Sequence, residues 1–370
     1  MASTKNGHRR QAESLSNYYD NGVSSMQPFM QFISFMTLLI FIPLNSIPSY
    51  CYKKHFGETL PFTMMLVPVV MELMQFITGT FYSGTILLLA VAVAGLILII
   101  LKMGDRKFRS LFFSSGFVAF LVVFLFVFML DFQRNFSDFD EFWHWGMMIK
   151  ESLRLDRFYC VPQSHMLVHK DYPPFLCMLE VFFSIIGGFS EGLVSASVHL
   201  FLLSIIVLPV AENMTDDELR YSHRYQHVIA KIVLWLLIVI FSIAFFDNEY
   251  TSNTILADTS LACVFGYGAY LILSDRIFFG SFYSLSLILD FVALINIKQV
   301  GIAMVGVLGF LALAMMIAEK KLRSKHSVLT ITGALVLSIG TSVVWNLYVK
   351  SQNIQDLRCR DNSLCPRLIR

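Results

Sequence analysis

Long apolar runs recur along almost the whole chain, and they constrain its fold more than any other feature. The 370 residues are 56% hydrophobic and 15% charged, against about 25% charged residues in average soluble domains. A helix needs roughly 20 apolar residues to cross the hydrocarbon core of a bilayer, so the runs predict a polytopic bundle of about 10–11 spans. We therefore predict an all-α transmembrane fold.

The apolar runs define a single transmembrane domain at 29–348, between a polar N-terminal tail at 1–28 and a C-terminal tail at 349–370. The six cysteines have no metal-ligand spacing and indicate no disulfide framework. The predicted spans lie near 29–48, 61–80, 83–101, 111–130, 173–190, 192–211, 228–246, 258–273, 281–297, 299–317 and 327–348.

Basic residues mark the loops that stay in the cytoplasm. "KMGDRKFR" at 102–109 and "EKKLRSKH" at 319–326 are the two best candidates. If 102–109 is cytoplasmic, the next span delivers residues 131–172 to the outer side of the membrane. The sequence therefore predicts a large external loop at 131–172.

A third basic segment, "RYSHRYQHVIAK" at 220–231, conflicts with this count of spans. If both 173–190 and 192–211 cross the membrane, the segment lies on the outer side. Either one of those two runs does not cross fully, or the segment breaks the rule for basic loops. The sequence leaves both alternatives open.

The external loop begins with a dense group of acids and aromatic rings, "DFDEFWHW". Asp138 followed by Glu141 is typical of a helix start, and we expect an amphipathic helix from 141 to 155 that lies on the membrane surface. Its predicted apolar positions are Phe142, Trp145, Ile149 and Leu153, with His144, Glu151 and Arg154 on other faces. The acid beside the helix cap, Asp140, has no capping role and is the candidate for chemistry.

The loop ends in "HKDYPPF", which predicts a second polar group beside a helix start. Pro173 and Pro174 suit the first turn of a helix, where a missing N–H leaves no bond unmade. Lys170 and His169 would then lie near a helix N-terminus, a natural place for a phosphate. Each of these residues also has a plain interpretation as an interface anchor or a helix signal.

This arrangement resembles the C-superfamily of membrane glycosyltransferases, which includes the lipid A aminoarabinose transferases and the protein O-mannosyltransferases. Asp140-Glu141 match the family's acidic motif in the first large external loop, and Tyr172-Pro173-Pro174-Phe175 match its Pro-Pro motif. "NTILADTSLACVFGYGAYLI" is similar to a later segment of the family and carries over Asp258. "NIKQVGIAMV" carries over Lys298 and Gln299 in the same way. The arginine that often follows the Pro-Pro helix is missing near 191–199, where His199 is the polar residue.

The resemblance implies an inverting transfer of a sugar from a polyprenyl-phosphate donor to a glycan, lipid or protein acceptor. Asp140 would be the general base and Glu141 would orient it or bind a sugar hydroxyl. The substrate-binding residues would be Trp143, His144, His169, Lys170, Tyr172, Asp258, Lys298 and Gln299. No cofactor is required, although a divalent cation, Mg²⁺ or Mn²⁺, could bridge the acids and the phosphate. The enzyme would sit in the plasma membrane with its site on the outer face, and it would bind no nucleic acid.

Two other functions remain open on the sequence. A transporter or flippase of a lipid-linked or anionic substrate is favoured by three acids inside the predicted spans, Glu72, Glu180 and Asp290, because intramembrane charges are costly and usually functional. Their plain interpretation is hydrogen bonding between helices in the bundle interior. A membrane-embedded oligosaccharide polymerase is the third alternative, although such an enzyme is expected to have arginine-rich external loops.

Overall fold

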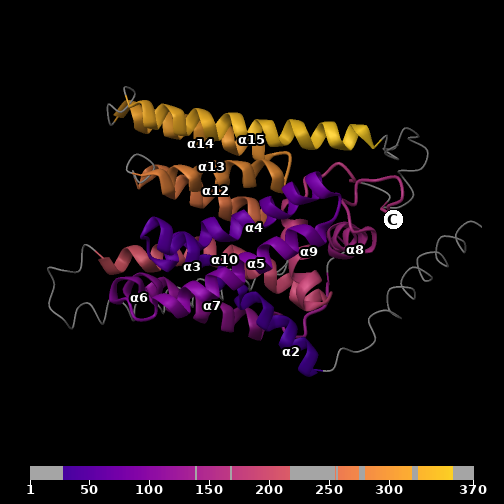
Figure 1. Ribbon diagram of the computed structural model, residues 1–370. Coiled ribbons are helices and arrows are strands. Elements are labelled where there is room, and N and C mark those ends of the chain that lie inside the picture. The colour runs from indigo at the N-terminus through magenta and orange to yellow at the C-terminus, as the bar shows by residue number, and fades with distance from the viewer. Residues whose placement is uncertain are drawn as a thin grey trace, which may run out of the picture.

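The structure is a computed structural model that describes residues 28–137, 140–166, 169–216, 255, 257–274, 280–318 and 324–352. Within these ranges the chain is all-helical and contains no strand. The helices run roughly side by side as one elongated bundle (Figure 1). The predicted all-α fold is therefore confirmed.

The helices of the first half are α2 (Pro28–Met36), η1 (Thr37–Ile40), α3 (Phe41–Tyr52), α4 (Phe56–Thr78), α5 (Phe81–Lys102), α6 (Arg106–Phe112) and α7 (Ser115–Asp131). The loop at 131–172 contains η2 (Glu141–Trp145), which is one turn of π-helix, and α8 (Gly146–Leu155). The remaining helices are α9 (Phe175–Gly187), α10 (Glu191–Asp216), α12 (Ala257–Leu273), α13 (Ser281–Ile297), α14 (Gly301–Ala318) and α15 (Lys325–Ser351).

Six helical segments among the described residues are long and apolar enough to cross a membrane, and the bent pair α6–α7 raises the number to seven. Two further apolar helices, α12 and α13, have 17 residues each. In lipid, a helix is favoured because it satisfies all its backbone hydrogen bonds internally. The chain is therefore a multi-pass integral membrane protein. The predicted span at 228–246 lies outside the described residues.

The bundle has two ends with different chemistry. One end, here called the loop face, carries the loop at 131–172, and the Asp156 carboxylate of that loop accepts the backbone N–H of Phe81 at 2.9 Å. The other end, here called the opposite face, joins α3 to α4 and α6 to α7. There Glu212 of α10 accepts the backbone N–H of Gly116 at 2.9 Å. The first contact places the start of α5 at the loop face, and the second places the start of α7 and the end of α10 at the opposite face.

The short helix α9 does not cross the bundle. It begins at the loop face, and α10 begins there as well, because Glu191 accepts the Phe136 N–H at 2.8 Å and lies 3.7 Å from the Lys150 ammonium. The predicted crossing at 173–190 is therefore wrong, and the first of the two alternatives for the basic segment at 220–231 holds: one run does not cross. The residues of α9 from Phe175 to Ser184 are all buried by protein.

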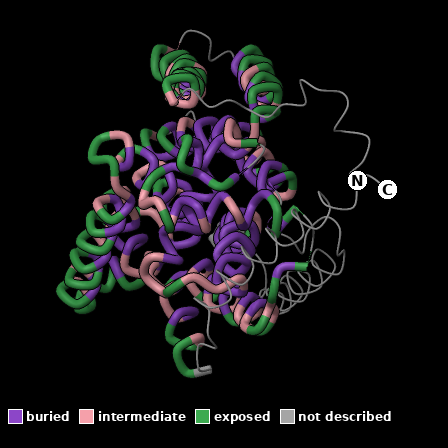
Figure 2. Tube along the Cα trace, turned by 90° about the vertical axis from the view of Figure 1, so that its right-hand side faces the viewer, coloured by how far each residue is buried: buried purple, intermediate pink, exposed green. Residues whose placement is uncertain are grey.

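Burial is arranged as expected for a membrane protein. Figure 2 shows buried residues in the middle of the bundle and exposed ones around its rim. The rim is apolar, for example Ile100 of α5, Phe310 of α14 and Leu329 of α15, and it forms the surface that lipid would cover. The least covered spans include α14 and α15, which lie along one side of the bundle (Figure 1).

The predicted surface helix at 141–155 exists, but its buried face differs from the expected one. Trp145 and Ile149 are buried as predicted, whereas Phe142 is 47% exposed and His144 and Glu151 are buried. The cause is the π-turn, which accommodates more residues per turn and so rotates the side chains away from the α-helical register. A Cβ atom at Gly146 would lie 2.5 Å from the Glu141 carbonyl oxygen, so glycine is needed where the turn tightens into α8.

Candidate functional site

Glu141 is the central buried carboxylate of the loop face. Its side chain is fully buried and accepts N–H donors from three places: the backbone N–H of Ser137 at 2.8 Å, that of Ile255 at 3.2 Å, and the Arg134 guanidinium at 3.3 Å. Hydrogen bonds to a charged group are worth roughly 1.5–3 kcal/mol each. Glu141 thus ties the loop to the segment before α12, and it suits an anchoring role better than a reactive one.

Asp140 and Trp143 flank this anchor on the accessible side of the turn. Asp140 is exposed and lies directly before η2, and the Trp143 side chain is 48% exposed. A buried carboxylate and an exposed one are therefore adjacent in the chain but have different environments. The Asp140 carboxylate is the one that a substrate could reach. Asp138, the predicted cap residue, lies outside the described residues.

His144 is the centre of a cluster of aromatic rings. Its ring lies 4.7–4.8 Å from those of Trp145, His169 and Tyr172, each at a steep angle, while His169 and Tyr172 stack on one another at 4.9 Å. The side chain is buried, and neither ring nitrogen has a hydrogen-bond partner among the described residues. His144 is therefore a buried polar ring that no contact among the described residues satisfies.

The pKa of His144 is lowered from its ordinary value of 6.5 to about 4, chiefly because the ring is buried and in smaller part because of His169 and Lys298, while Asp171 acts in the opposite direction. The imidazole is therefore neutral at physiological pH, with one nitrogen able to donate and the other able to accept a hydrogen bond. Asp171 belongs to the same loop as His144, whereas Lys298 comes from a distant part of the chain, the end of α13.

Polar residues at the ends of α12, α13 and α15 also lie at the loop face. The Lys298 ammonium lies 2.7 Å from the Asp258 carboxylate, which stands in the first turn of α12. The Gln299 side-chain N–H approaches the Asp171 carboxylate at 3.4 Å, and the Trp345 indole N–H donates to the Asp171 carbonyl at 3.0 Å. Residues predicted from three separate segments therefore lie around one end of the bundle.

The loop's last residues form a constrained turn in front of α9. His169 has a φ of 58°, a left-handed conformation that is uncommon for a residue other than glycine and is found most often at functional sites. The Lys170 ammonium donates to the Ser164 carbonyl at 3.1 Å. Pro174 directly precedes α9, so the double proline marks a helix start as predicted.

A buried charged group beside Glu141 was missed by the sequence reasoning. The Asp131 carboxylate forms a hydrogen bond of 2.7 Å with Nδ1 of the His199 ring and lies 3.7 Å from the Arg134 guanidinium, and both Asp131 and His199 are fully buried. Arg134 thus connects Asp131 to Glu141. The available signal was the pair of charges at the end of an apolar span, together with the polar His199 in a later apolar run.

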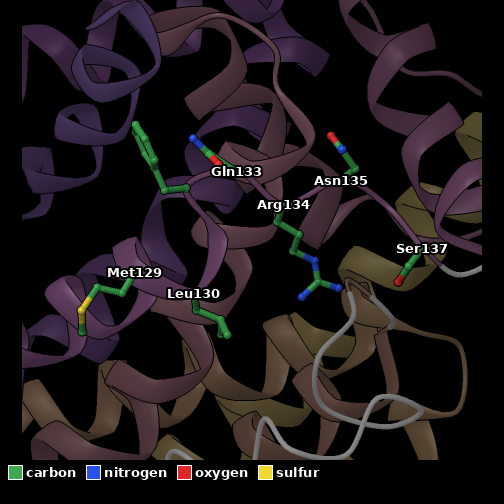
Figure 3. Close-up of a pocket in the computed structure, with 7 residues that line it drawn as sticks. Met129, Leu130, Gln133, Arg134, Asn135 and Ser137 are labelled. Atoms are coloured by element: carbon green, nitrogen blue, oxygen red, sulfur yellow. The ribbon is translucent and has the colours of Figure 1, made fainter. Parts of the chain in front are cut away.

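Arg134 also lines a pocket of about 570 Å³ at the end of α7. The pocket combines an apolar side with a polar one, and Figure 3 shows the Arg134 guanidinium extending between Leu130 and Ser137. Its lining residues are Met129, Leu130, Phe132, Gln133, Arg134, Asn135 and Ser137. Met129 is 74% exposed on the lipid-facing side of α7, so the pocket lies where lipid and loop meet.

No cluster of three or more His, Cys, Asp or Glu side chains in the described ranges could hold a metal ion. The acids that meet at the loop face are instead engaged by N–H donors or ammonium groups, as at Glu141 and Asp258. Comparison with protein-family models, with curated proteins and with solved structures found no match for this chain. Its function is therefore inferred from the geometry of the site.

Proposed function

We propose that this chain is a membrane-embedded glycosyltransferase that moves a sugar from a polyprenyl-phosphate donor to a glycan, lipid or protein acceptor. One observation carries the proposal. The acidic loop turn at 140–144 and the His169–Tyr172 turn lie together with Asp258, Lys298 and Gln299, which come from far later in the chain. These are the residue types that a reaction between a hydroxyl and a phosphate-linked sugar needs.

In this reaction Asp140 is the general base. It takes the proton of the acceptor hydroxyl while the hydroxyl oxygen bonds to the anomeric carbon, and the bond from that carbon to the phosphate oxygen breaks. The phosphate leaves as an anion and needs charge stabilisation, for which Lys298 and Lys170 are the candidates. The neutral His144 ring and Trp143 bind the sugar, and Glu141 holds the turn in place.

The outer side of the membrane is the proposed location of the site, in the plasma membrane. The basic loop at 102–109 lies at the opposite face, between α5 and α6. α10 ends at that face too, and α14 and α15 meet there. All three basic segments of the sequence thus follow or precede helix ends at one face. Because basic loops stay in the cytoplasm, the loop face would be external.

The proposal is tested with the purified full chain in liposomes, supplied with a panel of polyprenyl-phosphate hexoses and pentoses. We expect the release of polyprenyl phosphate to fall by about 10²-fold or more in Asp140→Asn, the low end of general-base catalysis. Donor binding, measured as a rise in the unfolding temperature with added donor, should be kept in this variant.

The matched control is Asp105→Asn, at an exposed acid of the opposite face. Asp105 caps α6 by accepting the Lys107 N–H at 2.8 Å, and asparagine caps a helix as well as aspartate does. This variant should therefore transfer sugar at the wild-type rate. Full transfer by Asp140→Asn would contradict the catalytic role of Asp140. A wild-type chain that neither binds nor cleaves any donor of the panel would contradict the proposed function. The transporter or flippase would then be the favoured alternative.

A further inference from the structure

Asp290 is an acid in the middle of α13 that the proposed reaction does not use. It is fully buried, and neither carboxyl oxygen has a hydrogen-bond partner among the described residues. From the bounds of α13 it lies about 13 Å from the start of the helix at the opposite face and about 10 Å from its end at the loop face. The plain interpretation of this acid, a hydrogen bond between helices, is therefore not met.

The surroundings of Asp290 are closely packed and apolar. A Cβ atom at Gly268 of α12 would clash with the Asp290 carboxyl oxygen and would lie 2.7 Å from Leu308 of α14. Glycine is thus required where three helices close around the acid. An isolated carboxylate in such a place costs several kcal/mol, and groups in this position are neutralised instead. The ligand that neutralises a carboxylate without any other partner is a proton.

A line of hydroxyl groups leads from Asp290 towards the opposite face. Tyr283, Ser286 and Asp290 follow one another on α13 at spacings of three and four residues, so they share one face of the helix. Tyr267 of α12 stands beside Gly268, the glycine that packs against the Asp290 carboxyl group, and it lines the same cavity as Tyr283. The acid, Ser286 and Tyr283 therefore form a strip of polar side chains along one face of α13.

The strip reaches a small cavity of about 10 Å³, roughly the space of one water molecule. Tyr267 and Tyr283 both line it, together with Glu58 and Tyr270. The Tyr283 hydroxyl donates to the Glu58 carboxylate in the first turn of α4, which begins at the opposite face. The cavity thus connects the strip to a titratable group at the membrane boundary.

Towards the loop face the same helix offers no comparable route. The residues after Asp290, from 291 to 297, are all buried, and all except Asn296 are apolar. On α13 itself, hydroxyl groups therefore lie between Asp290 and the opposite face, and none lies between Asp290 and the loop face. Along α13, Asp290 would therefore exchange its proton with the opposite face and not with the loop face.

We propose that Asp290 is a proton-binding site in the membrane interior, reached from the opposite face through Glu58, Tyr283, Tyr267 and Ser286. The exchange is a proton relay: as the Asp290 O–H bond breaks, each hydroxyl of the path takes one proton and releases its own to the next group, and the Glu58 carboxylate accepts the last one; the reverse sequence protonates Asp290. This inference stands on a different part of the molecule and does not depend on sugar transfer.

Infrared spectroscopy of the full chain in liposomes tests the proton. We expect a carboxylic acid C=O band at neutral pH that is lost in Asp290→Asn and shifts when the sample is moved into D₂O. Tyr267→Phe should keep the band and slow its shift, because it removes one hydroxyl of the path. Tyr82→Phe, at an exposed tyrosine of α5, is the matched control and should exchange at the wild-type rate.

A second measurement covers the case in which Asp290→Asn fails to fold. Dicyclohexylcarbodiimide adds to protonated carboxyl groups in apolar surroundings, and peptide mass spectrometry would place the adduct on Asp290 in the wild type. Asp290→Glu should keep the modification. The absence of both the adduct and the acid band in the folded wild type would overturn the proposal, and an unchanged exchange rate in Tyr267→Phe would overturn the path.

Discussion

Each end of the bundle buries a glutamate that anchors separate segments, Glu212 at the opposite face and Glu141 at the loop face, and the two are used differently. At the opposite face, Glu212 is bound by the His55 ring and the Ser114 hydroxyl, both at 2.7 Å, and by the backbone N–H groups of Gly57 and Gly116. At the loop face, Glu141 is also held by N–H donors. Both carboxylates compensate their burial with hydrogen bonds, as buried charges must.

The difference lies in what surrounds the anchor. Glu212 joins the starts of α4 and α7 to the end of α10, where a carboxylate suits the positive ends of two helices. Glu141 has the exposed Asp140 beside it, and its turn carries the His144 ring, whose nitrogens have no partner among the described residues, into a cluster of rings. At the opposite face, Glu212 and its partners His55, Gly57, Ser114 and Gly116, here called the clasp, join helices to one another. At the loop face, the exposed Asp140 lies where a ligand could bind.

The first prediction concerns which end of the bundle lies outside the cell, and labelling of cysteines gives a yes-or-no answer. In a chain with Cys51, Cys359 and Cys365 replaced by serine, a cysteine at the exposed Gln163 of the loop should react with a membrane-impermeant thiol reagent in intact cells. A cysteine at the exposed Ser110 of α6 should react only after the cells are opened. The reverse pattern would put the loop face in the cytoplasm and remove the outer-face mechanism.

Removal of the clasp should have the largest effect on stability. Glu212→Ala leaves several buried donors without an acceptor, and we expect a loss of roughly 3–5 kcal/mol in the free energy of unfolding. Thermal unfolding in detergent measures it. Glu191→Ala is the matched control on the same helix, because the Glu191 side chain is 20% exposed and accepts the Phe136 backbone N–H at 2.8 Å. Equal losses in the two variants would contradict the clasp.

Acidification should lower the free energy of unfolding, because His144 of the loop face is held neutral in the folded protein. Its pKa is 6.5 in the ordinary state and about 4 in the fold, so the unfolded chain binds a proton in this range that the folded chain does not. The stability that the neutral ring contributes is present above pH 6.5 and is lost as the pH falls from 6.5 towards 4.

The variant His144→Phe separates this effect from general acid unfolding. It keeps a ring in the cluster and removes the titration, so its unfolding temperature should fall less than that of the wild type between about pH 7 and about pH 5, as monitored by scanning fluorimetry. Identical pH profiles for His144→Phe and the wild type would show that His144 is not the sensitive group.

The helices were well predicted from the sequence, because hydropathy acts locally. Each span must satisfy its own backbone in lipid, so α12 and α13 lie within a residue of the predicted 258–273 and 281–297. The error at α9 has the same origin. An apolar run of sufficient length meets the local requirement for a span, and only the tertiary contact between Glu191 and Phe136 reveals that α10 begins at the same face.

The candidate site was predictable as residue types but not as an arrangement. Asp140, His144 and Tyr172 were recognised from their chemistry within one loop, and a resemblance added Lys298. No local pattern indicated that the Ile255 N–H binds Glu141, or that Asp131 forms a buried network with His199. Those contacts join segments dozens to more than a hundred residues apart.

That this protein is a bundle of membrane helices with a polar loop at one end follows from its sequence, since burial of apolar side chains and backbone hydrogen bonding are decided within each segment. Which of its acids serve as anchors depends on packing between segments. Glu141 and Asp290 are both fully buried acids. Packing surrounds Glu141 with N–H donors and surrounds Asp290 with a glycine and a leucine, and only the position of neighbouring helices sets that difference.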